Sequence, residues 1–200
     1  SQGDMDEEFH LEHIGTGLMQ TAELSVLEAS KEVVKFGNIT SRLFNMIPEL
    51  LKEADDKKFG KQMVRIQKYE DITDRMEVEI ADYLTKAAQG ELSDPASNKV
   101  RSMLSIINDM ERIGDICYQL SITIQRKNEQ KAYFTPKLRK TVEEMMLEVQ
   151  KALTIMNKNL GSEYSQVSII DANQAETIIN NMRNKLRKDY LQKIQKGEFN

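Results

Sequence analysis

The stretch NDMERIGDICYQL, residues 108–120, sets two acids and a glycine inside an otherwise apolar helical pattern. Residues three and four apart share one flank of a helix, and the flank that holds Glu111 and Asp115 is apolar on either side of them. The whole row reads Leu104, Ile107, Glu111, Asp115, Tyr118 and Ile122. An apolar row of this kind is typical of a helix packed in a bundle. The presence of two acids and of Gly114 at such a place therefore needs a physical explanation.

A second row of the same kind lies earlier in the chain. It reads Met63, Ile66, Glu70, Asp74, Glu77, Ala81 and Leu84. If the two helices are antiparallel neighbours in one bundle, the acids of both rows lie near mid-length and face each other.

Acids spaced in this way repel one another. Carboxylates four residues apart on a helix lie about 5 to 6 Å apart, and at an effective dielectric constant of about 20 their repulsion is roughly 3 kcal/mol. Protonation, an Arg or Lys from another helix, or a bound cation would offset it, and hard divalent or ferric ions prefer oxygen ligands. Arg112 points away from Glu111. Gly114 costs roughly 1 kcal/mol relative to alanine, which the close approach of a neighbouring backbone would justify.

The composition predicts an all-α fold, an antiparallel helical bundle. The 200 residues are 40% hydrophobic and 30% charged, with three prolines and nine glycines, and good helix formers dominate. We expect about five long helices, and Pro48 should kink or interrupt the first. Ser25 and Glu28 have capping-box spacing, and Ser93 or Asp94 caps the third helix before Pro95. The expected helices cover about 24–50, 59–88, 93–126, 135–161 and 164–196.

The helices form two related units. Apolar positions of 36–50 recur at 146–160, and the acidic pattern of 70–76 recurs in part at 176–182, which predicts two three-helix repeats. We expect an amino-terminal linker or arm at 1–23, a first repeat at 24–127, and a second repeat at 132–200 that lacks its last helix. An incomplete bundle predicts a homo-oligomer, a dimer or larger. Because the chain begins SQGDMDEEF, we expect a piece of a longer protein.

Several classes of protein are excluded by composition and motifs. The net charge of −4 comes without any run of five basic residues, so no nucleic-acid partner is expected. No apolar run approaches the roughly 18 residues of a membrane span. The single Cys117 indicates a reducing compartment and a small buried side chain. The only histidines, His10 and His13, lie in the arm, so the di-iron chemistry of bundles that carry Glu-x-x-His motifs on their helices is not expected. No catalytic motif is present, so we expect a non-enzymatic protein.

Three segments resemble one family. MERIGDICYQLS (110–121) resembles the E-R-I-G-D helix of PhoU-type proteins, which consist of two three-helix repeats with a metal-binding acidic face, and YEDITDRMEVEI (69–80) is similar to its companion helix. The segment EEFHLEHIGTGLMQTAELSVLEASKEV (7–33) is similar to the stretch that joins the membrane part of bacterial sodium/phosphate cotransporters to their carboxy-terminal PhoU-like domain.

The resemblance implies one metal site. Its ligands would be Glu70, Asp74, Glu111 and Asp115, and the ion would be Fe, Zn, Mn, Mg or Ca. In the second repeat Glu176 matches but Asn180 replaces the expected acid. The helix that would carry the remaining motif is missing, so a second cluster is not expected.

The resemblance also implies a function. The chain would be the cytoplasmic regulatory domain of a sodium-dependent phosphate transporter at the inner membrane, with the transporter's own membrane domain as its partner. The alternatives are a free-standing PhoU-like regulator of phosphate signalling and a helical metal-binding bundle of another role. A parent reading frame with membrane spans before Ser1 would favour the transporter.

Overall fold

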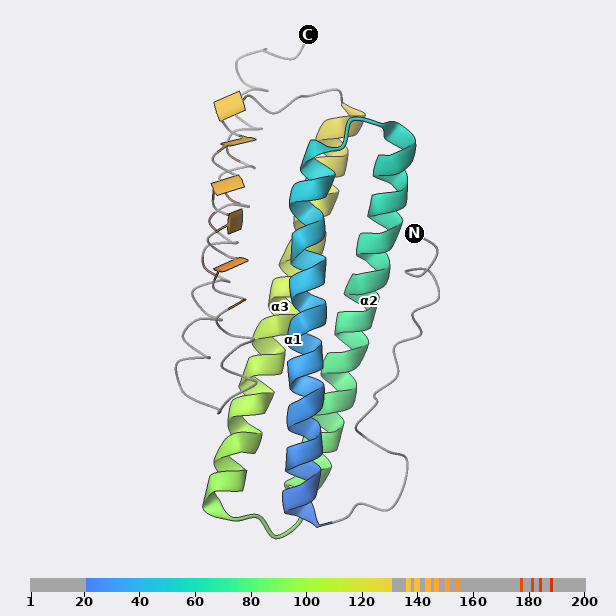
Figure 1. Ribbon diagram of the computed structural model, residues 1–200. Coiled ribbons are helices and arrows are strands. Elements are labelled where there is room, and N and C mark those ends of the chain that lie inside the picture. The colour runs from blue at the N-terminus through green and yellow to red at the C-terminus, as the bar shows by residue number, and fades with distance from the viewer. Residues whose placement is uncertain are drawn as a thin grey trace.

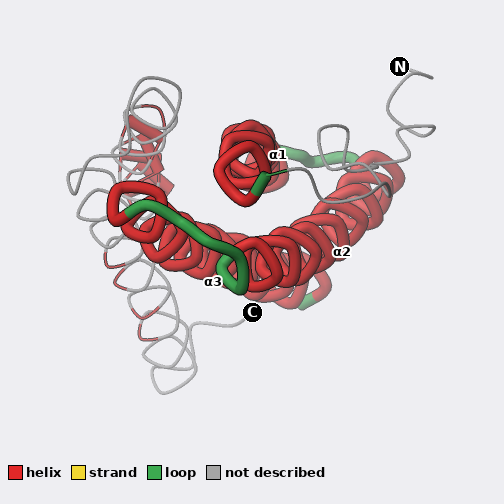
Figure 2. Tube along the Cα trace, turned by 90° about the horizontal axis from the view of Figure 1, so that it is seen from below, coloured by secondary structure: helices red, strands yellow, loops and turns green. Residues whose placement is uncertain are grey.

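The computed structural model describes residues 21–130 without a break and single helical positions between 136 and 188. The continuous part holds three long helices and no strand: α1 (Ala22–Lys52), α2 (Asp56–Ala87) and α3 (Asp94–Glu129). The helices run up, down and up (Figure 1), and each packs against the other two. An end-on view shows α1 lying beside both α2 and α3 (Figure 2). The all-α prediction is therefore confirmed for this part of the chain.

The first backbone N–H groups of a helix have no carbonyl partner within the helix. In each of the three helices, the side chain of the residue before the first turn accepts a hydrogen bond from one of these N–H groups. The bonds are Leu24 N–H to Thr21 Oγ1 at 3.4 Å, Lys58 N–H to Asp55 Oδ1 at 2.8 Å, and Ala96 N–H to Ser93 Oγ at 3.3 Å. The predicted cap at Ser93, with Pro95 in the first turn of α3, is confirmed.

α1 begins two residues before the predicted start at about residue 24, and the predicted capping box at Ser25 is wrong. Ser25 does not cap the helix; it is buried one turn inside it, and its N–H donates to the Thr21 carbonyl at 3.1 Å. Thr21 is an equally suitable cap one turn earlier, and starting there buries Val26 and Ala29 in the core.

The interruption expected at Pro48 does not occur, because α1 continues to Lys52. A proline inside a helix costs about 3 kcal/mol. Leu50 and Leu51 lie beyond it and are buried, and burying a leucine side chain stabilises the fold by about 1.5 to 3 kcal/mol. Packing of these two leucines therefore offsets the proline.

The apolar stripes of the three helices form one core. Its largest fully buried side chains include Phe36, Phe44, Ile66, Tyr69 and Met103. Cys117 is buried among them, as predicted, and burial raises the pKa of its thiol. None of the helices in the described part combines the length and apolar character needed to cross a membrane.

The chain beyond α3 is described only in part. The described positions at 136–154 and 177–188 are helical. Met146 is buried in the three-helix core, and Glu143 forms an ion pair with Lys52 of α1 at 3.7 Å. The bounds of the expected fourth and fifth helices lie outside the described residues. So do the arm at 1–20 and the second-repeat positions Glu176 and Asn180.

Gly114 marks a point where the three helices come close together. A Cβ atom on Gly114 would lie 3.1 Å from Thr73 Oγ1 of α2 and 3.5 Å from Leu43 Cδ2 of α1. The sequence predicts the close approach of a neighbouring backbone, whereas the atoms that approach are side-chain atoms. Thr73 is held in place because its hydroxyl donates to the Glu70 carbonyl at 2.9 Å.

Glycine substitutions test this contact. Gly114→Val should lower the free energy of unfolding by about 1 to 3 kcal/mol, because the added methyl groups overpack the junction. Gly60 is the matched control, since a Cβ atom there meets nothing within 4 Å. Gly60→Ala should raise the free energy of unfolding by about 0.5 to 1 kcal/mol through helix propensity. Urea denaturation measures both, and a Gly114→Val protein as stable as the wild type would contradict the close contact.

Candidate functional site

The four acids predicted as ligands lie on adjoining flanks of α2 and α3. α2 ends at Ala87 and α3 begins at Asp94. The number of residues from Glu70 to the end of α2 equals the number from the start of α3 to Glu111. Because α2 and α3 are antiparallel and joined by a short turn, the two acids lie at the same level of the bundle. Asp74 and Asp115 lie one turn away on the same flanks. We call Glu70, Asp74, Glu111 and Asp115 the acidic face.

The acidic face lies at the edge of the core. Ile107 of the α3 row is buried, whereas Leu104, Glu111, Asp115 and Tyr118 are only partly buried. The carboxylates therefore keep some contact with water while losing part of their hydration. The apolar residues on either side of the acids in the sequence do not reveal this partial exposure.

The carboxyl groups of the two helices affect one another. Burial raises the pKa of Glu111 to about 7, and a hydrogen bond to Asp74 together with repulsion from Asp74 and Asp115 adds to the rise. Burial likewise raises the pKa of Glu70 to about 7, with further repulsion from Asp74, Asp71 and Asp115. Both groups are therefore partly protonated near neutral pH, which relieves the repulsion between the helices.

Residues beside the four acids belong to the same site. Burial and the Asp74 charge raise the pKa of Glu77, a member of the α2 row that the sequence reasoning did not count as a ligand. Two glutamines, which the sequence reasoning missed, donate to the acids. Their side chains form the bonds Gln67 Nε2 to Glu70 Oε2 at 3.4 Å and Gln119 Nε2 to Asp115 Oδ2 at 3.2 Å. Their spacing of three and four residues from the acids could have indicated them.

The donor chemistry of the acidic face suits a hard cation, because all its candidate ligand atoms are carboxylate oxygens. The side chains are not arranged as ligands. Within the described residues, no three His, Cys, Asp or Glu side chains converge on a point that could hold a metal ion. Binding would require the acids to change rotamers. His10 and His13 lie outside the described residues.

The sequence matches a known protein family over most of the three helices. The family model of the PhoU domain matches residues 33–123. This range includes most of α1, the whole of α2 and most of α3, and it contains the entire acidic face. Together with the all-helical fold, the match supports a PhoU-like domain in this part of the chain. No curated protein and no solved structure gives a significant match.

The raised pKa values predict a pH dependence of stability. Between the ordinary glutamate pKa of 4.5 and the value of about 7, the folded chain binds more protons than the unfolded chain. The free energy of unfolding should therefore fall as the pH rises through this window. The double variant Glu70→Gln and Glu111→Gln mimics the protonated state. Its free energy of unfolding should fall less over this window than that of the wild type, and above pH 7 it should be more stable than the wild type.

Thermal unfolding across this pH range provides the measurement. Glu79→Gln, at an exposed position of α2, serves as the control and should leave the slope unchanged. A double variant with the wild-type slope would show that Glu70 and Glu111 do not carry the effect.

Proposed function

We propose that this chain is a non-enzymatic, PhoU-like regulatory domain with a phosphate-related role, and that its acidic face binds a divalent or ferric ion. The observation that carries this proposal is the PhoU domain match over residues 33–123, which contains all four acids. The mutual repulsion of these acids supports the second part, because repulsion leaves the site in need of positive charge.

Metal binding would link the helices of the bundle. An ion held by Glu70 and Asp74 of α2 and by Glu111 and Asp115 of α3 would neutralise the repulsion between them. Carboxylates must lose their protons to act as ligands, so metal and protons compete for the site. We therefore expect metal affinity to rise as the pH passes about 7, where Glu70 and Glu111 ionise.

A metal titration tests the site. Mn²⁺, Zn²⁺, Mg²⁺, Ca²⁺ or Fe³⁺ should raise the thermal midpoint of the wild type above pH 7. A ligand at about 100 times its Kd stabilises a fold by about 2.7 kcal/mol. The double variant Glu111→Ala and Asp115→Ala should lose this stabilisation, and Glu79→Ala should keep it. Equal effects of every metal on the wild type and on the double variant would contradict the site.

We further propose that the domain belongs to a sodium-dependent phosphate transporter and lies on the cytoplasmic face of the membrane. The similarity of residues 7–33 to the segment that precedes such domains supports this. The partner would be the transporter's own membrane domain. Self-association of the domain is a further prediction.

The complete reading frame tests the transporter proposal. It should encode several spans of roughly 20 apolar residues upstream of Ser1. Removing the domain from that gene should change sodium-dependent phosphate uptake without removing the transporter from the membrane. A reading frame without such spans would instead favour a free-standing PhoU-like regulator, and unchanged uptake would contradict a regulatory role in the transporter.

A further inference from the structure

Two glutamine side chains each hold an acid of the acidic face. On α2, the Gln67 Nε2 group donates to Glu70 Oε2 at 3.4 Å and to Asp71 Oδ1 at 3.1 Å. On α3, the Gln119 Nε2 group donates to Asp115 Oδ2 at 3.2 Å. A glutamine amide has two N–H donors. The two bonds of Gln67 therefore use both of its donors and fix the orientation of its amide.

Both glutamines lie on the same side of the acids that they hold. Gln67 precedes Glu70 on α2, whereas Gln119 follows Asp115 on α3. Because α2 and α3 run in opposite directions (Figure 1), both glutamines lie toward the end of the bundle where α2 begins and α3 ends. The two amides therefore draw Glu70 and Asp115 toward that end. We call Glu70 and Asp115 the glutamine-held pair.

The other two acids lie toward the opposite end. Asp74 follows Glu70 on α2, and Glu111 precedes Asp115 on α3, so both lie nearer the turn that joins the two helices. A hydrogen bond joins the side chains of Asp74 and Glu111, and we call them the directly bonded pair. This division of the acidic face into two pairs accounts for the lack of any ligand cluster among the described residues.

We propose that Gln67 and Gln119 are positioning residues that hold Glu70 and Asp115 away from the directly bonded pair and thereby weaken cation binding at the acidic face. This inference rests on the proposed metal site and adds a means of regulating it. An ion that binds all four acids must turn the glutamine-held pair toward the other two. That movement breaks amide–carboxylate hydrogen bonds, which are stronger than bonds between neutral groups. The lost bonds reduce the net free energy of ion binding.

Isothermal titration calorimetry of the full chain with Mg²⁺, Ca²⁺ or Zn²⁺ above pH 7 tests this proposal. Gln67→Met and Gln119→Met remove the amide, and methionine is an unbranched side chain with a helix propensity close to that of glutamine. Each variant should bind the ion more tightly than the wild type, by up to roughly tenfold, which corresponds to about 1.4 kcal/mol. The double variant should show both gains.

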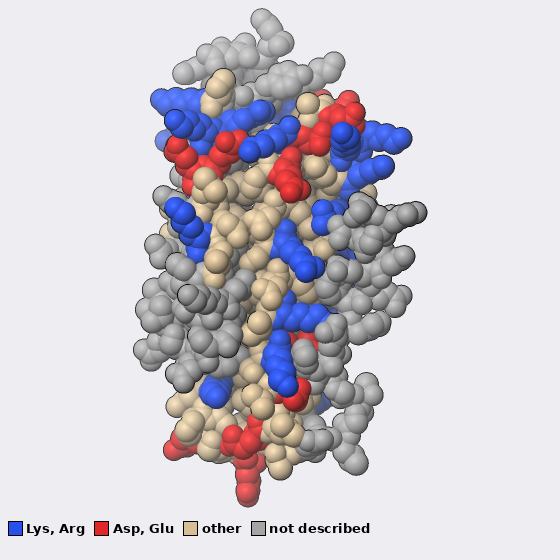
Figure 3. Space-filling model, viewed as in Figure 1, with Lys and Arg blue, Asp and Glu red and all other residues tan. Residues whose placement is uncertain are grey.

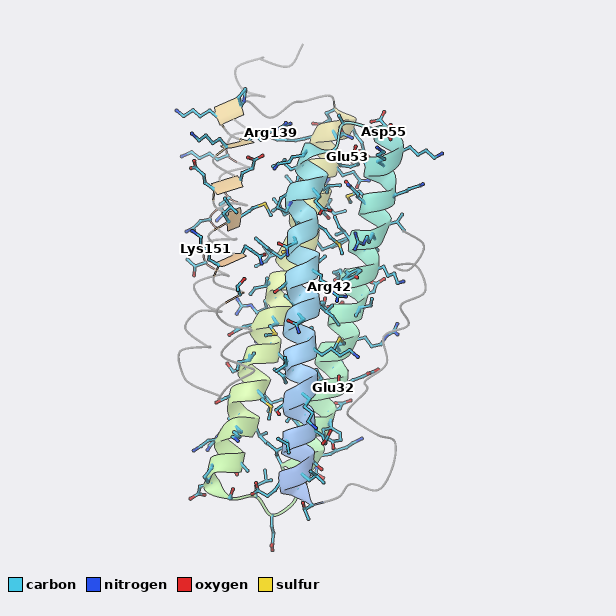
Figure 4. The ribbon with its side chains drawn as sticks, in the orientation of Figure 1. Glu32, Arg42, Glu53, Asp55, Arg139 and Lys151 are labelled. Carbon is cyan, nitrogen blue, oxygen red and sulfur yellow. The ribbon has the colours of Figure 1, made fainter. Side chains whose placement is uncertain are left out.

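Gln62→Met is the matched control. Gln62 is a half-buried residue of α2, and its Nε2 group donates to Glu53 Oε2 at 3.4 Å. Glu53 and Asp55 lie together at one end of the bundle (Figure 4). Most acidic side chains on the face that α1 forms gather toward its two ends (Figure 3). An ion bound near Glu53 would respond to Gln62→Met, whereas the affinity of the acidic face should not change.

A spectroscopic signature separates positioning from a general effect on stability. The side-chain amide resonances of Gln67, Gln119 and Gln62 in nitrogen-15 NMR spectra are assigned by their loss in the three Met variants. In the wild type, saturation with the ion should move the Gln67 and Gln119 resonances toward those of a free glutamine, because their bonds to carboxylates break. The Gln62 resonance should stay in place.

Four outcomes would overturn the proposal. Equal affinity of the wild type and the double Met variant would show that the amides do not oppose binding. Weaker binding by the double variant would show that they support the ion-bound arrangement instead. Amide resonances of Gln67 and Gln119 that do not move on saturation would show that their bonds persist. These three results leave the proposed metal site intact, whereas failure of both the wild type and the double variant to bind any ion would contradict the site as well.

Discussion

The close packing of α2 against α3 at Gly114 determines how the acidic face is built. Gly114 has no side chain, so Thr73 of α2 and Leu43 of α1 come within contact distance of the place that a Cβ atom on Gly114 would occupy. Thr73 in turn bonds the Glu70 carbonyl, and Asp115 follows Gly114 directly. The same contact that joins the three helices therefore places carboxylates of two helices at one level, where each raises the cost of ionising the others.

Protonation and cation binding each relieve this crowding, and they exclude each other. Protons on Glu70 and Glu111 remove charge when no ion is bound, and burial favours this state up to a pH of about 7. A cation held by the ionised acids would remove the same repulsion at higher pH. On this proposal the acidic face changes from a protonated to a metal-bound state near neutral pH. This change would alter the strength of the interaction between α2 and α3.

Much of this arrangement can be predicted from the sequence, because it follows from helix periodicity. Spacing assigns Glu70 and Asp74 to one flank of their helix and Glu111 and Asp115 to one flank of theirs. Given an antiparallel bundle it predicts that these flanks face each other, and in the structure the acids of the two helices act on one another. Periodicity cannot show that the row of α3 that holds Glu111 and Asp115 lies at the edge of the core. That position depends on the orientation of α2 and α3 about their own axes.

Local rules fail at two places in α1. They cannot choose between Thr21 and Ser25 as the cap, since both are suitable residues one turn apart. At Pro48 the expected interruption is absent because the burial of Leu50 and Leu51 outweighs the cost of the proline. In both places the packing of the three helices decides the outcome, and packing is not visible in a short stretch of sequence.

Exchange of protons for a cation at the acidic face near neutral pH can be measured directly. Carbon-13 NMR of the glutamate side-chain carboxyls, titrated with and without a diamagnetic ion such as Mg²⁺, Ca²⁺ or Zn²⁺, follows Glu70 and Glu111 individually. We expect apparent pKa values near 7 for both groups in the absence of metal and lower values in its presence. Titration of both groups at their ordinary value of 4.5, unchanged by any of these ions, would contradict the exchange.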